Sequence, residues 1–329
     1  MHIPENYLSP STCAVAYAVM LPIWHVAAKR ASAEVAREKL PLVGIAAAFS
    51  FLAMMFNIPL PGGTTGHAVC GTLIAILFGP WPACLAISIA LAIQAVFFGD
   101  GGILSFGANC LNMAFVLPFV GHFVYSVISR RVGGLRGELL GAGVGSYVGL
   151  NAAALMCAIE FGIQPLLFTD ASGAALYCPY PIAVAVPAMM LGHLTVAGMA
   201  EVGFTVGILA FVRNAAPSFG ARRADASDAS LTPVLALVAA LVAACPLGLL
   251  ATGDAWGEWA TEDVAQMVGY APAGLANGWE WSSLMPDYSV GALPEWAGYM
   301  VSAVIGVTLL IIVFRLAAHS MRPSVDFDA

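Results

Sequence analysis

The chain has 329 residues, of which 60% are hydrophobic and 9% are charged, and its formal net charge is −7. Soluble domains carry about 25% charged residues, so this composition excludes a soluble globular protein and predicts an all-α polytopic membrane protein surrounded by membrane lipid. The negative charge also argues against a nucleic-acid partner.

The chain begins with Met1, His2, Ile3, Pro4 and Glu5, which lack the basic start of a secretory signal. A free Met1 amine, the His2 backbone nitrogen and the His2 imidazole Nδ1 can close a five- and a six-membered ring on one metal. Ni(II) and Cu(II) favour such tetragonal nitrogen sites. A second histidine could supply the fourth nitrogen. The alternative is that the Met-His start binds nothing.

Nine apolar runs follow that are long enough to be taken as membrane spans. They lie at about 11–28, 41–57, 67–79, 81–98, 108–129, 138–162, 181–212, 232–252 and 296–314. The third is short and meets Gly79-Pro80-Trp81-Pro82, which is typical of a tight turn between two helices.

The twelve Lys and Arg residues predict the orientation. They occur only after the first, fifth, seventh and ninth runs. An outer N-terminus therefore places all of them in the cytoplasm, as the positive-inside rule requires. We expect a multi-pass protein of the bacterial cytoplasmic (inner) membrane, with the N-terminus outside and the C-terminus cytoplasmic.

This orientation places the N-terminus and three connecting loops, 58–66, 99–107 and 163–180, on the outer face. The first two are rich in glycine, as in Pro61-Gly62-Gly63 and Gly99-Asp100-Gly101-Gly102. Non-helical backbone at a membrane boundary is tolerated where it lines a cavity or packs on protein. His67 ends the first of these loops and is expected on the same side as His2.

The chain divides after the seventh run. Residues 1–213 are predicted as a metal-binding membrane domain, 214–231 as a cytoplasmic linker, and 232–329 as a two-helix auxiliary membrane region with an external loop at 253–295. That loop is rich in tryptophan and in acidic residues, namely Asp254, Glu258, Glu262, Asp263, Glu280, Asp287 and Glu295. It is either an interfacial aromatic belt on a solvated loop or an acidic surface that gathers cations.

Several catalytic motifs are missing from the sequence. Neither lysine follows a G-x4-G, so there is no phosphate-binding Walker A loop, and there is no H-E-x-x-H or G-x-S-x-G. His122 and His193 are predicted as packing residues. Glu160 and Glu201 lie within spans, where carboxylates are costly and tend to be functional; Glu201 could pair with His193.

Three segments of the sequence resemble the CbiM/NikM family, the substrate-binding (S) components of energy-coupling factor (ECF) transporters for nickel and cobalt. They are Met1-His2-Ile3-Pro4, the run from Met55 to His67 that contains Pro59-Leu60-Pro61-Gly62-Gly63-Thr64-Thr65-Gly66, and the run from Phe98 to Met113. The likeness continues through Asn151 and Gly192-His193, so it covers the first seven runs. The Pro-x-Pro-Gly-Gly-Thr-Thr version is more similar to the nickel (NikM2-like) branch, and the last two runs resemble a fused NikN-like region.

The resemblance implies a seven-helix bundle that binds Ni(II) in a near-planar site of four nitrogens: the Met1 amine, the His2 amide, the His2 imidazole and the His67 imidazole. It implies a membrane T component and separate ATPase subunits as partners, with no resident cofactor. Asn109, Asn112 and Asn151 are candidates for orienting His67. Three alternatives stay open: the same role for Co(II), a carrier that works without an ATPase, and, remotely, a metal-dependent intramembrane enzyme.

Overall fold

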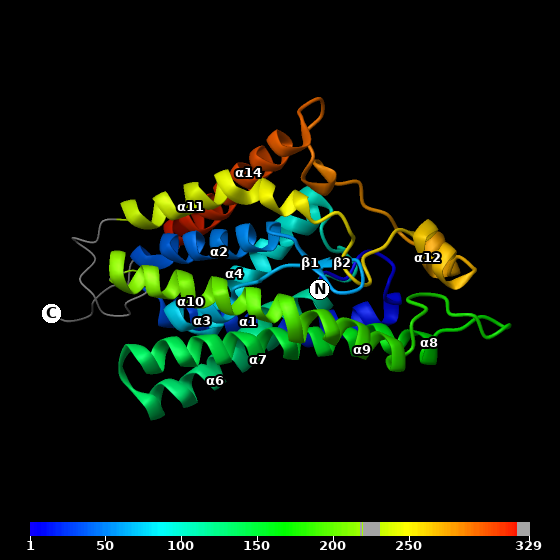
Figure 1. The fold of residues 1–329 in the computed structure, drawn as a ribbon, viewed down its shortest axis with the longest axis horizontal. Coiled ribbons are helices and arrows are strands. Elements are labelled where there is room, and N and C mark those ends of the chain that lie inside the picture. The colour runs from blue at the N-terminus through cyan, green and yellow to red at the C-terminus, as the bar shows by residue number, and fades with distance from the viewer. Residues whose placement is uncertain (218, 220–230, 321–329) are drawn as a thin grey trace.

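The computed structural model describes residues 1–217, 219 and 231–320 and consists mainly of long helices (Figure 1). Within these residues, eight helical stretches are long and apolar enough to cross a membrane. They are Pro10–Glu34, Arg37–Met55, Pro80–Phe98, Phe106–Val132, Gly134–Leu167, Ile182–Ala215, Thr232–Leu250 and Glu295–Ser320. The predicted all-α polytopic membrane class is confirmed.

Most of these stretches contain one long regular helix. The long helices are α1 (Pro10–Glu34), α2 (Leu40–Met55), α4 (Pro80–Ile93), α6 (Leu117–Val132), α7 (Gly134–Gly162), α9 (Ile182–Gly192), α10 (Gly198–Ala215), α11 (Thr232–Ala244) and α14 (Glu295–Ser320). Wide π-helical turns interrupt three stretches at Gln94–Phe98, Cys110–Val116 and His193–Ala197. Such turns are rare and often occur at functional sites.

Short elements cap the bundle and connect the helices. They are the 3₁₀ helices Arg37–Lys39, Cys245–Leu250 and Pro286–Tyr288, the strands β1 (Ile58–Leu60) and β2 (Thr64–Gly66), and the helices α3 (Gly71–Phe78), α5 (Phe106–Asn109), α8 (Gln164–Leu167), α12 (Thr261–Val268) and α13 (Ala273–Ala276). The two strands form an antiparallel hairpin in which Ile58 pairs with Gly66. Gly62 and Gly63 both have a positive φ at its tip, which glycine adopts without steric strain.

The third predicted span, 67–79, was wrong as a membrane-spanning helix. Only α3 is helical there, and its eight residues reach about 12 Å, less than half of a hydrocarbon core of about 30 Å. The helix cannot begin earlier because Cys70 has a left-handed φ of 60° and the amides of Val69 and Cys70 bind the Glu201 carboxylate. The extended segment is buried in protein, where irregular backbone is tolerated.

The two ends of the bundle differ in content (Figure 1). α8 and α12 lie at one end, the α6–α7 turn and the end of α10 lie at the other, and the N-terminus and the β1–β2 hairpin lie between them. Arg130 and Arg131 are in the last turn of α6, and Arg213 is in the last turn of α10. The basic ends of α6 and α10 are therefore at the end of the bundle away from α8 and α12, and the orientation in the membrane stays a prediction.

The C-terminal pair of helices packs on the bundle through α14 and α2. A Cβ atom added to Gly306 would lie 2.2 Å from the Phe51 ring, and one added to Gly44 would lie 2.8 Å from Phe314. These glycines therefore allow the close approach of the two helices. The predicted linker, 214–231, lies largely outside the described residues, as does the chain after Ser320.

Candidate metal centre

The first residues of the chain enter the bundle and are buried there. The exposed fractions of Met1, His2 and Ile3 are 3%, 2% and 0%. The Ile3 amide donates to Asn109 Oδ1 at 2.7 Å, and the Ile3 carbonyl accepts from Asn109 Nδ2 at 3.1 Å and from the Gly102 amide at 2.8 Å. A side-chain amide in α5 thus satisfies both backbone groups next to His2, as burial of backbone demands.

The glycine-rich turn after α4 is shaped to accept the N-terminal segment. A Cβ at Gly102 would lie 2.7 Å from the Glu5 nitrogen and 2.8 Å from the Pro4 carbonyl carbon, so only glycine allows this approach of two backbones. The Glu5 carboxylate accepts hydrogen bonds from the amides of Ile103 and Leu104. Loop 99–107 therefore packs directly against the N-terminal segment.

The structure brings together His2 and His67, which are 65 positions apart in the sequence. His67 Nε2 lies 3.3 Å from His2 Nδ1, and both side chains are buried, with exposed fractions of 6% and 2%. Adjacent nitrogens on one metal, each bonded at about 2.0–2.1 Å, are about 3 Å apart. The two ring nitrogens are therefore positioned as neighbouring ligands of a single ion would be.

The Met1 amine lies beside a carboxylate from the far end of the chain. Its nitrogen is 3.0 Å from Glu258 Oε1, and the two residues are separated by 257 positions. Burial lowers the pKa of this amine, but the charges of Glu258 and Asp100 oppose burial, and the net effect is a raised pKa. In the metal-free protein the amine is thus held as an ammonium ion.

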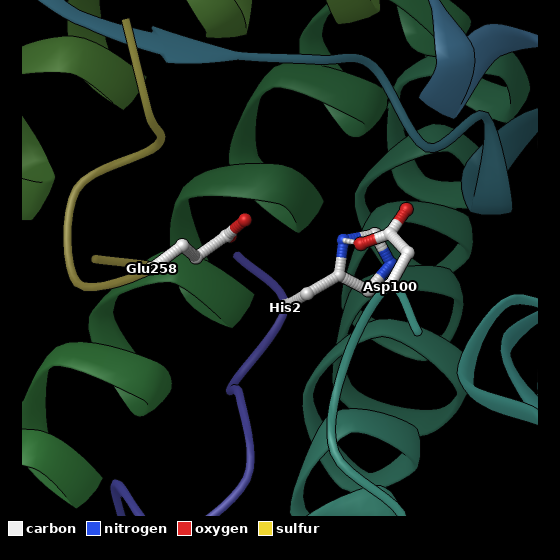
Figure 2. Close-up of side chains that lie close together, drawn as sticks. All are labelled: His2, Asp100 and Glu258. Carbon is white, nitrogen blue, oxygen red and sulfur yellow. Dashed lines mark ion pairs between the residues drawn. The ribbon is translucent and has the colours of Figure 1, made fainter. Parts of the chain in front are cut away.

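A second carboxylate contacts the His2 imidazole. Asp100 Oδ1 lies 3.0 Å from His2 Nδ1, and Asp100 Oδ2 accepts hydrogen bonds from the Tyr288 hydroxyl at 2.5 Å and from Gln94 Nε2 at 3.2 Å. Figure 2 shows the Asp100 carboxylate over the His2 ring and Glu258 approaching from the opposite side. Ligand atoms of His2, Asp100 and Glu258 all lie within 4.8 Å of one another.

The sequence reasoning missed Asp100 and Glu258 as members of this cluster. Asp100 stands out in the sequence as the acidic residue of Gly99-Asp100-Gly101-Gly102, and Glu258 stands between two tryptophans in an acidic loop. Nothing in the sequence pairs either residue with the N-terminus, because the two contacts depend on how loop 99–107 and the loop after α11 pack on the N-terminal segment.

The segment that carries His67 is fixed by Glu201 of α10. The Glu201 carboxylate is fully buried and accepts hydrogen bonds from the amides of Val69 at 2.7 Å and Cys70 at 3.0 Å. Ser50 Oγ donates to the Val69 carbonyl at 2.6 Å. The predicted pairing of Glu201 with His193 was wrong, because the His193 Nδ1 atom lies 2.8 Å from the carbonyl of Met189 in its own helix.

The environment of His67 favours its neutral form. Burial lowers the pKa of His67 well below the usual 6.5, and the charge on the Met1 amine and the nearby His2 lower it further. Its Nδ1 lies 3.2 Å from the Ala68 carbonyl, which leaves Nε2 facing His2. A neutral imidazole is the form that binds a metal.

The three asparagines predicted to orient His67 form hydrogen bonds with other groups in the structure. Asn109 holds the backbone of Ile3, Asn112 Nδ2 donates to Glu160 at 2.6 Å, and Asn151 Nδ2 donates to the Tyr147 carbonyl at 2.8 Å. Only Asn109 therefore acts close to the predicted ligands, through the N-terminal segment and not through His67. His122 lies in α6 with its Nδ1 3.5 Å from Ser126 Oγ.

A cavity of about 610 Å³ opens beside these groups. His2 and His67 line it, together with five acidic residues: Asp100, Asp254, Glu258, Asp287 and Glu295. The Thr65 amide of the hairpin donates to the Asp254 carbonyl at 3.1 Å, so the C-terminal loop closes one side of the cavity. A small cation inside it would meet nitrogen donors on one wall and carboxylates on the other.

Comparison with known proteins divides the chain into two regions, each of which matches a family model. Residues 2–219 match the CbiM family model, described as the cobalt uptake substrate-specific transmembrane region, and residues 232–322 match the PDGLE domain. The fused nickel transport protein NikMN of Rhodobacter capsulatus is 49% identical over 97% of both chains. The probable fused nickel transport protein LarMN of Lactiplantibacillus plantarum is 45% identical over 98% of this chain and 99% of its own length.

A solved structure matches the first part of the fold. The crystal structure of a truncated transition metal transporter is 50% identical, with a TM-score of 0.61, and covers 64% of this chain and 98% of its own. The chain therefore belongs to the CbiM family, in the fused form in which the CbiM region is followed by a PDGLE domain.

Proposed function

We propose that this protein is the substrate-capturing membrane subunit of an ATP-driven ECF-type importer, which binds Ni(II) on the outer side and delivers it inward. The observation that carries the proposal is the convergence of the Met1 amine, His2 and His67 in one buried place inside the bundle, away from its basic helix ends. The nickel transport proteins among the relatives support the choice of cargo.

The proposed ligands are four nitrogens in a plane. Met1 and His2 supply three of them through adjoining chelate rings, and His67 Nε2 supplies the fourth. A planar nitrogen donor set suits Ni(II). The Met1 amine and the His2 amide must lose protons to bind, so tight binding requires both a free N-terminus and a neutral imidazole at each histidine.

Energy and release would come from other subunits. The sequence contains no Walker A loop, which is a phosphate-binding loop of ATPases. ATP hydrolysis is therefore assigned to separate ATPase subunits, and this subunit is not an enzyme. A membrane T component would couple ATP turnover to reorientation of the bundle and so open the site to the cytoplasm. Copurification of these subunits with the tagged protein tests this part, and ATP-independent uptake by the chain alone would contradict it.

Cobalt is the second candidate cargo. The CbiM family model is described by cobalt uptake, and Co(II) can use the same nitrogen ligands. The deciding experiment measures metal content and visible absorption of the protein with its native N-terminus and a C-terminal tag. A yellow, diamagnetic complex with one nickel per chain supports the proposal. Preferential retention of cobalt moves the cargo to Co(II), and absence of both metals rejects the site.

A further inference from the structure

We propose that His2, Asp100 and Glu258 form a capture site of mixed nitrogen and oxygen ligands that holds a partly hydrated divalent cation before it reaches the four nitrogens. This inference rests on the proposed function and adds an earlier step to it. Its starting point is the close approach of three ligand-bearing side chains from three separate segments of the chain (Figure 2).

The geometry of the cluster suits an octahedral ion. His2 Nδ1 and Asp100 Oδ1 are 3.0 Å apart, and the ligand atoms of all three residues lie within 4.8 Å. An ion bonded at about 2.1 Å to each ligand places adjacent ligands about 3 Å apart and opposite ligands about 4.2 Å apart. Small side-chain movements therefore complete a three-ligand site that leaves room for water.

The electrostatics of the cavity favour arrival of a cation at this point. Five carboxylates line the cavity, and none of the lining residues in the described part of the chain is Lys or Arg; the Met1 ammonium, 3.0 Å from Glu258 Oε1, offsets one of the five negative charges. Four of these carboxylates, on Asp254, Glu258, Asp287 and Glu295, come from the C-terminal region. A cavity lined by one sign of charge concentrates ions of the opposite sign and raises their association rate.

Asp100 and His2 are held in different ways. Hydrogen bonds from Tyr288 and Gln94 fix Asp100 Oδ2, which leaves Oδ1 directed at His2. The imidazole of His2 is 98% buried, yet its Nε2 atom has no hydrogen-bond partner among the described residues. Metal-binding histidines usually have their second nitrogen fixed by a partner. No hydrogen bond from Nε2 therefore fixes the orientation of the His2 ring, and Nδ1 is the atom that faces both Asp100 and His67.

Transfer from the capture site follows from shared ligation. His2 Nδ1 belongs both to the carboxylate cluster and to the proposed planar site, and it lies 3.3 Å from His67 Nε2. The cation can thus exchange Asp100 and Glu258 for His67 and the N-terminal nitrogens without leaving His2. In this arrangement the C-terminal region supplies one ligand, Glu258, and most of the charge around it.

The first test measures how fast the nickel complex forms. Metal-free protein with its native N-terminus is mixed with Ni(II) alone in a stopped-flow instrument, and visible absorption is followed. We expect Glu258→Gln and Asp100→Asn each to slow the second-order rate by at least about tenfold, and to weaken its dependence on salt. Glu280→Gln is the matched control, because Glu280 lies in the same external loop, is exposed and does not line the cavity.

Wild-type rates in both variants would overturn the capture site, provided that thermal unfolding shows them to be folded. Absence of any coloured complex in the wild-type protein would instead reject the planar site. The capture site is then judged by a second measurement, X-ray absorption of His67→Ala with Ni(II). The proposal is supported if His67→Ala holds six-coordinate nickel with mixed nitrogen and oxygen ligands and the double variant with Glu258→Gln does not. It is rejected if His67→Ala binds no nickel.

Discussion

The two walls of the cavity differ in how far they are exposed to solvent and in the kind of ligand atom that they offer. The nitrogen wall, formed by His2 and His67, and the adjoining Met1 are at most 6% exposed, and the neighbouring backbone is fixed by buried hydrogen bonds. The carboxylate wall is wetter: the side chains of Glu258 and Asp100 are 21% and 20% exposed. Fixed donors favour one coordination geometry, whereas partly exposed carboxylates keep part of their hydration.

The two walls also come largely from different parts of the chain. His2 and His67 lie within the region that matches the CbiM model, which begins directly after Met1, and four of the five cavity carboxylates lie within the region that matches the PDGLE domain. The comparison suggests that selective binding belongs to the first region and that capture depends on the second. If this division holds, changes to the first region should lower the affinity for nickel, and changes to the carboxylates should slow its capture.

Blocking the N-terminal amine should have the largest effect on nickel binding. One residue added before Met1 converts the amine into an amide and removes a chelate ring, so bound nickel should fall to background in metal analysis. The same residue added at the C-terminus is the control. Intact-mass measurement should show that the active protein keeps Met1 without a formyl group. Full nickel content in the extended protein would contradict the chelate.

Replacement of His67 by alanine removes the fourth nitrogen. Removing a residue that only supports a metal ligand weakens metal binding by up to about a hundredfold. Because His67 is proposed as a ligand itself, we expect His67→Ala to weaken nickel affinity by at least about that much. His122→Ala should bind as the wild type does, because His122 lies in α6 and does not line the cavity. Equal losses in the two variants, measured by calorimetric titration, would indicate general unfolding instead.

Asn109→Ala should cause an intermediate loss. The substitution leaves the amide of Ile3 without its Asn109 partner inside the bundle, and each unsatisfied buried group costs about 1–3 kcal/mol. Affinity for nickel should therefore drop by about 10- to 100-fold. Asn151→Ala is the matched control, since Asn151 binds only the carbonyl of Tyr147 in its own helix. An unchanged affinity in Asn109→Ala would show that the N-terminal segment docks without it.

The pH dependence should follow the amine and not His67. The Met1 amine has a pKa raised above 8.0 and must lose a proton to bind, so nickel affinity should fall by at least about tenfold for each pH unit as the pH drops below that pKa. Because the pKa of His67 is well below 6.5, His67 stays neutral between about pH 8 and pH 6.5 and adds no slope there. A flat affinity profile across this range would contradict ligation by the amine.

The class of protein can be read from the sequence alone, and so can the chelate that we propose for Met1 and His2. Low charge and long apolar runs require a membrane, and the placement of Lys and Arg predicts an orientation. The chelate of Met1 and His2 is equally local, because covalent bonds alone set its ring sizes. The His67 ligand could be proposed only from the family resemblance and the shared outer face, and its role as a ligand stays a prediction.

Only the tertiary structure decided what surrounds those nitrogens. Glu258 lies 257 residues from Met1, and its contact with the amine depends on the packing of the loop after α11, where the Trp259 carbonyl accepts a hydrogen bond from the Tyr7 hydroxyl. The short α3 and the role of Glu201 likewise depend on a carboxylate of α10 reaching the amides of Val69 and Cys70. Periodicity and composition report which residues are buried, but not which distant groups meet. Those partners are set by the packing of whole helices.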